Sequence, residues 1–160
     1  MIDKKTKAQL IEIWRKLDAK KAFDFDAAGF ESPEYAGVIG KPDVHLGNRG
    51  VIDAHLTLDL VNNGGLKAGL WHTHPCTGGA WLSEQDVACW KHFELPEMVL
   101  LCKAGVFAFK LHEYTPRLQG KNFNTMFLSA GQQVKLERIT LFESGAKQTG
   151  LRDFFKLWGF

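Results

Sequence analysis

The order of elements along the chain predicts an α/β fold, in which a mixed β-sheet is flanked by helices on its faces. Three observations support this prediction. Apolar residues at helical spacing open the chain, several apolar segments of strand length follow, and a second helical segment separates two groups of these strands. The chain has 160 residues, 45% of them hydrophobic, so we expect a single domain over residues 1–160 with one packed core.

The first element is predicted to be an amphipathic helix that packs on the sheet. Its apolar residues are Leu10, Ile11, Ile13, Trp14 and Leu17. Residues 20–29 then indicate an irregular connection, which Phe23 and Phe25 are expected to anchor. This connection leads into a strand that contains Glu34.

Two further strands are predicted before the middle of the chain. Residues 51–60 alternate strictly between apolar and polar, which is typical of a half-buried strand. The side chains expected to face the core are those of Ile52, Ala54, Leu56, Leu58 and Leu60. Residues 66–71 indicate a buried strand that runs into His72, and Pro75 then prevents further sheet pairing.

In the second half of the chain, Ser83 is predicted to be the N-cap of a helix. The inner side of that helix carries Val87, Trp90 and Phe93. Residues 98–102 and 106–111 are predicted to form a hairpin. Residues 115–133 contain Pro, Gly and Asn at short intervals, which indicates a long insertion without regular structure. Residues 134–142 are predicted to form another strand, and residues 151–158 a terminal amphipathic helix. The apolar side of that helix is expected to pack in the core, and an interface with another chain is the alternative.

His72, His74 and Asp86 form a candidate metal site. Residues i and i+2 of an extended chain point the same way, about 7 Å apart, so the two imidazoles can hold one ion. Asp86 falls in the first turn of the predicted helix, where its carboxylate can face them. Catalytic zinc takes three such protein ligands and leaves a fourth position to water. Ser83-x-x-Asp86 also matches a capping box, which needs no metal, and a lone histidine is more often an ordinary polar residue.

These residues together resemble the signature of the JAMM metalloproteases, the catalytically competent JAB or MPN domains. That signature is a Glu, then His-Ser/Thr-His-Pro, then Ser-x-x-Asp. Here the upstream Glu is Glu34, followed by Gly37 and Gly40 at the family's spacing, and the resemblance covers residues 34–111. It implies the JAB/MPN architecture, which is cytidine deaminase-like. The motifs of a zinc deaminase itself, His-x-Glu and Pro-Cys-x-x-Cys, are missing.

The resemblance also implies a role for each residue. His72, His74 and Asp86 would hold Zn²⁺, Glu34 would act as general base and then acid, and Ser83 would donate a hydrogen bond to the oxyanion. Residues 75–82 make the loop before Ser83 one residue longer than is usual in the family, and its two glycines can absorb the extra residue.

Other residues were weighed for the same site. Glu31 is a rival for Glu34 but lacks the glycine spacing that follows Glu34. Cys76 is open to interpretation as a nucleophile, an additional metal contact or a plain loop residue. Cys89 and Cys102 fall in apolar patterns and are expected to be buried. The remaining histidines lack partners at ligand spacing and are expected to be structural or solvated, with His55 exposed; they are His45, His55, His92 and His112.

The expected function is that of a zinc peptidase or isopeptidase acting at the C-terminal tail of a ubiquitin-like protein or its conjugate. A peptidoglycan or phage-tail-associated peptidase and a non-catalytic MPN-like scaffold remain alternatives, and an activating protein partner that orders the loops is left open. A net charge of +2 favours neither nucleic acid nor an anionic membrane as a partner. The charged N-terminal start and the odd number of cysteines, three, predict a cytoplasmic protein.

Overall fold

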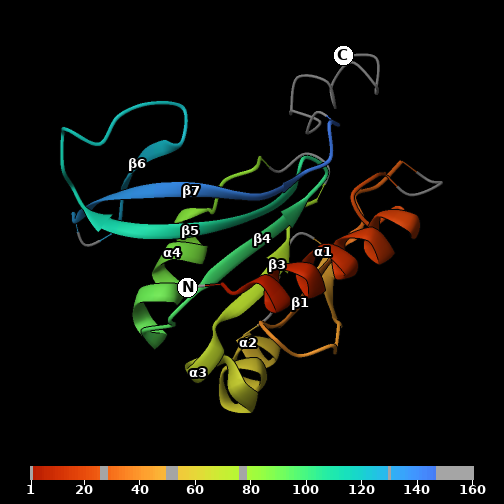
Figure 1. The fold of residues 1–160 in the computed structure, drawn as a ribbon. Coiled ribbons are helices and arrows are strands. Elements are labelled where there is room, and N and C mark those ends of the chain that lie inside the picture. The colour runs from red at the N-terminus through yellow and green to blue at the C-terminus, as the bar shows by residue number, and fades with distance from the viewer. Residues whose placement is uncertain (1, 26–28, 50–53, 76–78, 130, 147–160) are drawn as a thin grey trace.

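The protein is built on one seven-stranded sheet, seen here in a computed structural model that describes residues 2–25, 29–49, 54–75, 79–129 and 131–146 (Figure 1). The strands are β1 (Pro33–Val38), β2 (His45–Arg49), β3 (Leu70–Thr73), β4 (Met98–Cys102), β5 (Gly105–Glu113), β6 (Phe123–Phe127) and β7 (Gln133–Glu143). They lie in the order β2-β1-β3-β4-β5-β7-β6. Only β3 and β4 pair in parallel, so the sheet is mixed and the predicted α/β class is confirmed.

Helices cover both faces of the sheet, and each face has its own core. Helix α1 (Lys4–Ala19) packs on one face, and α2 (Ala54–Leu60) and α4 (Glu84–Phe93) contribute to the core on the other. Neighbouring residues of a strand belong to opposite cores, as Trp71 and Val99 do on the α1 side and Leu70 and Met98 on the α4 side. Burial on both faces explains why the central strands are apolar throughout rather than alternating.

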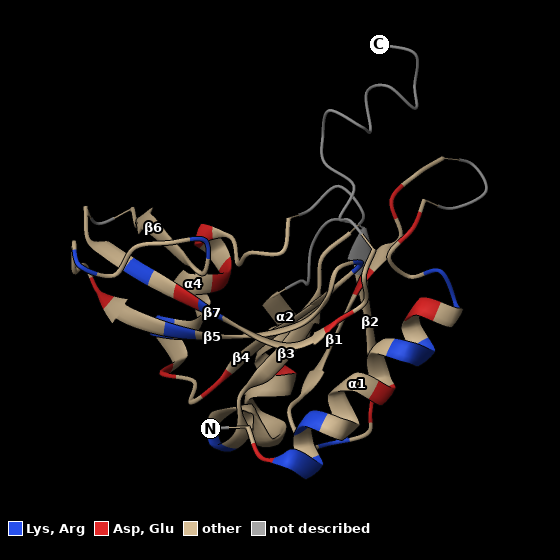
Figure 2. Ribbon diagram, turned by 45° about the horizontal axis from the view of Figure 1, so that its top comes forward, with Lys and Arg blue, Asp and Glu red and all other residues tan. Residues whose placement is uncertain are grey.

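The predicted first helix is confirmed. Asp3 is its N-cap, accepting a hydrogen bond of 2.7 Å from the backbone N–H of Thr6, and this bond holds the pKa of the Asp3 carboxyl below its ordinary value. Trp14 lies on its buried side and donates from Nε1 to the carbonyl of Cys102 at 2.7 Å. The outer side of α1 is dominated by charged residues, as Figure 2 shows. No helix among the described residues is long and apolar enough to cross a membrane.

The predicted strand over residues 51–60 is wrong, because the described part of it is helix α2. Leu56 and Leu60 are four residues apart, so they lie on one side of a helix as well as on one face of a strand. Leu60 is buried and Leu56 packs on the core, whereas Leu58 is 45% exposed. The leucines of this segment therefore fit both the two-residue repeat of a strand and the 3.6-residue repeat of a helix. Packing against the sheet selected the helix. Residues 51–53 lie outside the described residues.

The strand predicted over residues 66–71 begins later than expected. A π-helical turn η1 (Val61–Gly65) and the short helix α3 (Leu66–Ala68) follow α2, and β3 begins at Leu70. Gly69 ends the helical stretch with a φ of +90°, and a Cβ there would lie 2.3 Å from the carbonyl oxygen of Glu97. Only glycine allows the chain to turn into β3 this close to the start of β4.

The later elements agree with the prediction except in one segment. The helix after Ser83, the β4–β5 hairpin and the long strand β7 are confirmed. Residues 115–133 were expected to lack regular structure, which is wrong, because β6 lies within them and pairs antiparallel with β7. Met126 of β6 is buried against the core, and this contact stabilises a strand that its polar sequence does not indicate. The predicted helix over 151–158 lies outside the described residues.

Replacing Gly37 by alanine is expected to destabilise the protein by about 1–3 kcal/mol. Gly37 pairs with Trp71 across β1 and β3, and an added Cβ would lie 2.5 Å from Nε1 of that indole. Gly79→Ala is the matched control, because nothing lies within 4 Å of a Cβ added there. Denaturant unfolding of both variants checks the prediction, and equal midpoints would contradict it.

Candidate metal centre

The two histidines of the candidate site lie at the end of a central strand. His72 is in β3 and is 8% exposed, on the face of the sheet that α4 covers. His74 follows the strand and donates its backbone N–H to the carbonyl of Leu101 in β4 at 3.0 Å. Hydrogen bonding to the neighbouring strand thus continues past the end of β3 and holds both imidazoles on one side of the sheet.

Asp86 reaches the histidines from the first turn of α4. Ser83 is the N-cap of this helix: its Oγ accepts from the backbone N–H of Asp86 at 3.1 Å, and Oδ2 of Asp86 accepts from the backbone N–H of Ser83 at 2.8 Å. Both hydrogen bonds of a capping box are therefore present. It does not compete with a metal role, because the same bonds fix the carboxylate toward the sheet.

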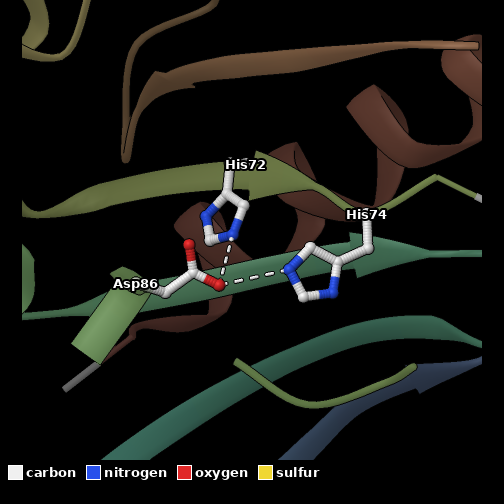
Figure 3. Close-up of side chains that lie close together, drawn as sticks. All are labelled: His72, His74 and Asp86. Atoms are coloured by element: carbon white, nitrogen blue, oxygen red, sulfur yellow. Dashed lines mark hydrogen bonds and ion pairs between the residues drawn. The ribbon is translucent and has the colours of Figure 1, made fainter. Parts of the chain in front are cut away.

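His72, His74 and Asp86 converge on one point (Figure 3). Oδ2 of Asp86 lies 3.2 Å from Nε2 of His72 and 3.2 Å from Nε2 of His74. One ligand atom from each residue lies within 4.8 Å of the others. Two imidazole nitrogens and one carboxylate oxygen are a donor set that suits zinc, so this group could hold a metal ion.

A hydrogen bond from His74 to Gly79 determines which ring nitrogen of His74 faces His72 and Asp86. Nδ1 of His74 lies 2.9 Å from the carbonyl oxygen of Gly79. A carbonyl only accepts, so Nδ1 carries the proton, and in the neutral ring Nε2 is left with its lone pair. That lone pair lies 3.2 Å from a carboxylate oxygen, a contact that needs a proton or a cation in between. Nε2 of His72 is also buried, and Oδ2 of Asp86, at 3.2 Å, is the atom it faces, so this contact has the same need for a proton or a cation.

Charge and burial shift the pKa values of Asp86 and His72 in the direction that a cation site requires. Burial alone would raise the pKa of the Asp86 carboxyl, but attraction and hydrogen bonds from the two histidines outweigh it, and the pKa lies far below its ordinary value. Burial would likewise lower the pKa of His72, yet the negative charges of Asp86 and Glu34 raise it overall. The two carboxylates thus stabilise positive charge at the imidazole of His72.

Glu34 lies in the same cavity as the three ligand candidates. It is in β1, is 9% exposed, and lines a cavity of about 480 Å³ together with His72, His74, Ser83 and Asp86. Burial is the largest cause that raises the pKa of its carboxyl above the ordinary 4.5. The rival Glu31 is not among the residues that line this cavity. Of the two glutamates, Glu34 is therefore the one whose carboxylate faces the ligand candidates.

Glu34→Gln is expected to make the metal-free protein more stable at neutral pH. Burial raises the pKa of Glu34 in the folded protein above its value in the unfolded chain. As the pH rises through these two values, the unfolded chain releases its proton first, so the free energy of unfolding falls. This loss is complete once the pH exceeds the pKa of the folded state. The gain should therefore be largest near pH 7 and should vanish near pH 4. Thermal unfolding in the presence of a chelator checks this, with Glu12→Gln on the exposed side of α1 as control. A gain that is equal at both pH values would contradict the expectation.

The structure also locates the other residues that were considered. His55, His92 and His45 are exposed, and the expected exposure of His55 is confirmed. His112 was expected to be structural or solvated, and its Nε2 lies 3.0 Å from a carboxylate oxygen of Glu137, a contact between β5 and β7 away from the metal site. Cys102 is buried as expected and Cys89 is half-buried, and burial raises the pKa of both thiols. Cys76 lies outside the described residues.

Arg138 of β7 supports the loop between the histidines and α4, a role that the sequence did not indicate. Its Nη1 donates to the carbonyl of Ala80 at 3.0 Å, and its guanidinium lies over the rings of Trp81 at 4.5 Å and Phe107 at 5.1 Å. Ala80 directly follows Gly79, the residue that orients His74. A strand distant in sequence thus holds in place the loop that positions a ligand candidate.

Arg138→Ala is expected to lower the free energy of unfolding by about 1–3 kcal/mol, because the carbonyl of Ala80 loses its donor and Trp81 loses the stacked cation. Arg138→Lys should lower the free energy of unfolding by a smaller amount, because lysine keeps the positive charge although it lacks the planar guanidinium group. Denaturant unfolding of the two variants measures this order, and an equal loss in both would contradict it, because the charge that lysine retains would then contribute nothing.

Comparison with known proteins does not assign the chain to a family. It was compared with models of protein families, with curated proteins and with solved structures, and nothing in the three comparisons matched it. The geometry of the cavity and the motif resemblance are therefore what points to a function.

Proposed function

We propose that the chain is a zinc-dependent peptidase or isopeptidase of JAB/MPN architecture that hydrolyses an amide bond. Its substrate would be the C-terminal tail of a ubiquitin-like protein or of its conjugate. The observation that carries the proposal is the convergence of His72, His74 and Asp86 in a cavity that also holds the buried carboxylate of Glu34. A site that served only to bind metal would have no use for that second carboxylate.

His72, His74 and Asp86 would hold the metal, and the capping box with Ser83 would keep Asp86 in place. When bound, zinc supplies a Lewis acid that lowers the pKa of water and polarises an amide carbonyl. Glu34 would take one proton from the attacking water while the water oxygen bonds to the amide carbon. As the carbon–nitrogen bond breaks, Glu34 would give that proton to the leaving amine. A raised pKa suits a carboxylate that must both accept and return a proton.

Ser83 would stabilise the negative oxygen of the tetrahedral intermediate. Its Oγ accepts the backbone N–H of Asp86, so the hydroxyl proton remains available to donate. Ser83 lines the same cavity as Glu34, on the side that α4 forms. One hydroxyl would then serve both the helix cap and the reaction.

The free thiols of Cys89 and Cys102 are in keeping with a reducing, cytoplasmic setting, which we also propose for this chain. A partner protein that orders the loops around the cavity could be required for full activity. Neither a nucleic acid nor a membrane is part of the proposal.

Incubation of the zinc-loaded protein with ubiquitin-like conjugates tests the function directly. One substrate should carry an isopeptide bond and the other a linear C-terminal extension, and mass spectrometry should identify the cleaved bond. We expect cleavage by the wild type and cleavage slower by a factor on the order of 10²–10⁴ by Glu34→Gln. Binding without cleavage by both proteins would favour a scaffold module, and cleavage of peptidoglycan fragments alone would favour a cell-wall peptidase.

A further inference from the structure

We propose that the cavity beside the metal centre is a specificity pocket, which receives an uncharged, apolar side chain from the substrate residue adjoining the cleaved amide. This inference rests on the proposed hydrolytic function and adds the class of residue that the site selects. The cavity of about 480 Å³ lies within the range of roughly 300–1,000 Å³ that is usual for small-ligand sites. It therefore has room for more than the reacting groups.

The cavity extends from the ligand candidates toward the start of β3 and β4. Leu70 precedes His72 by two residues on the same face of β3, and Met98 is its pairing partner in β4. On α4, Cys89 lies one turn beyond Asp86. All three of these residues line the cavity, so its walls continue away from the metal centre along both the sheet and the helix.

Helix α2 supplies the remaining wall. Thr57 and Leu60 also line the cavity, and Leu60 is buried in the same core as Leu70 and Met98. The pocket thus exists because residues 54–60 form a helix rather than the strand that their alternation predicts.

The carboxylates and imidazoles in the cavity wall are those of Glu34, His72, His74 and Asp86. The part of the wall formed by α2, the first residues of β3 and β4, and the second turn of α4 is uncharged: it consists of Leu60, Leu70 and Met98, with the hydroxyl of Thr57 and the thiol of Cys89. Burial raises the pKa of that thiol, so it stays uncharged at neutral pH. A charged substrate side chain would lose its hydration there, whereas an apolar one would gain from burial.

The first experiment measures binding without turnover. The zinc-loaded Glu34→Gln protein, carrying ¹³C-methyl methionine, is titrated with N-acetyl-leucinamide, N-acetyl-glycinamide and the corresponding glutamate and lysine amides. We expect the leucine probe to shift the methyl resonance of Met98 and to bind at least about tenfold more tightly than the glycine probe. Met126 of β6 serves as the internal reference, because it is buried and does not line the cavity.

A pocket-filling variant supplies the second measurement. Cys89→Phe should abolish the Met98 shift and shift substrate preference at the adjoining position from leucine to glycine or alanine. Ala88→Phe is the matched control, since it adds the same ring to the same helix at an exposed position and should leave the preference unchanged. Equal zinc content in the two variants shows that the metal centre is intact.

The outcomes separate this inference from the proposed function. A leucine-selective Met98 shift that Cys89→Phe removes supports the pocket even if no conjugate is cleaved, in which case only the hydrolytic function fails. Equal binding of the charged probes, or no shift with any probe, overturns the pocket even if the protein proves to be a hydrolase.

Discussion

His74→Ala is expected to lose its bound zinc while the wild type holds close to one ion per chain. The structure gives the reason: Nε2 of His74 is one of three donor atoms that lie within 4.8 Å of one another, and Gly79 orients that nitrogen toward the group. Loss of residues that merely orient a ligand typically costs about 10–100-fold in metal affinity, and loss of a ligand should cost more. Metal analysis after dialysis and titration calorimetry with Zn²⁺ measure the change.

The controls for this experiment separate a ligand from a nearby polar residue. His92→Ala removes an exposed histidine from the far end of α4 and should keep its zinc. Asp86→Asn should behave like His74→Ala, because an uncharged amide cannot balance the positive ion. It can still accept from the backbone N–H of Ser83, so α4 should remain capped. Zinc retained by both His74→Ala and Asp86→Asn would show that the ion binds elsewhere.

Glu34→Gln is expected to reduce amide hydrolysis by a factor on the order of 10²–10⁴, the usual contribution of a positioned general acid–base group. The amide of glutamine has nearly the same shape as the carboxylate but cannot accept the proton of water. Zinc content should be unchanged, since Glu34 is not in the His72–His74–Asp86 group. Single-turnover rates with a saturating substrate measure the loss in the chemical step.

Ser83→Ala provides a graded comparison for that result. Loss of one oxyanion donor typically costs on the order of 10²–10³ in turnover. The same change removes the N-cap of α4, so stability should fall by about 0.5–2 kcal/mol, whereas Glu34→Gln should cause no such loss. Normal turnover by Glu34→Gln would contradict the proposed role of Glu34, and the result for Ser83→Ala would not change that conclusion.

Local signals were sufficient for most of the elements. The apolar residues of α1 recur at helical spacing over the whole element, and Ser83 with Asp86 forms a cap within four residues of chain, so neither depends on distant contacts. The hairpin of β4 and β5 joins strands that are adjacent in sequence. In each case the interaction that defines the element lies within its own segment of the chain.

Two elements were predicted wrongly because distant partners decide them. Residues 54–60 carry leucines that fit a strand or a helix, and packing of Leu60 into the core beside Leu70 selects the helix. The polar segment 123–127 forms a strand only because β7 presents an edge to it and the core accepts Met126. Burial and edge pairing are properties of the assembled sheet, and a window of sequence does not contain them.

The sequence by itself determined the donor set of the candidate site, because two histidines in extended chain and an aspartate in a capped first turn have directions dictated by local backbone geometry. Only the tertiary structure decided how that set is used. It brought Glu34 from β1 into the same cavity, placed Arg138 of β7 behind the loop that orients His74, and closed the pocket with α2. Those contacts join segments tens of residues apart, and their positions follow from the strand order of the sheet and the packing of helices on it.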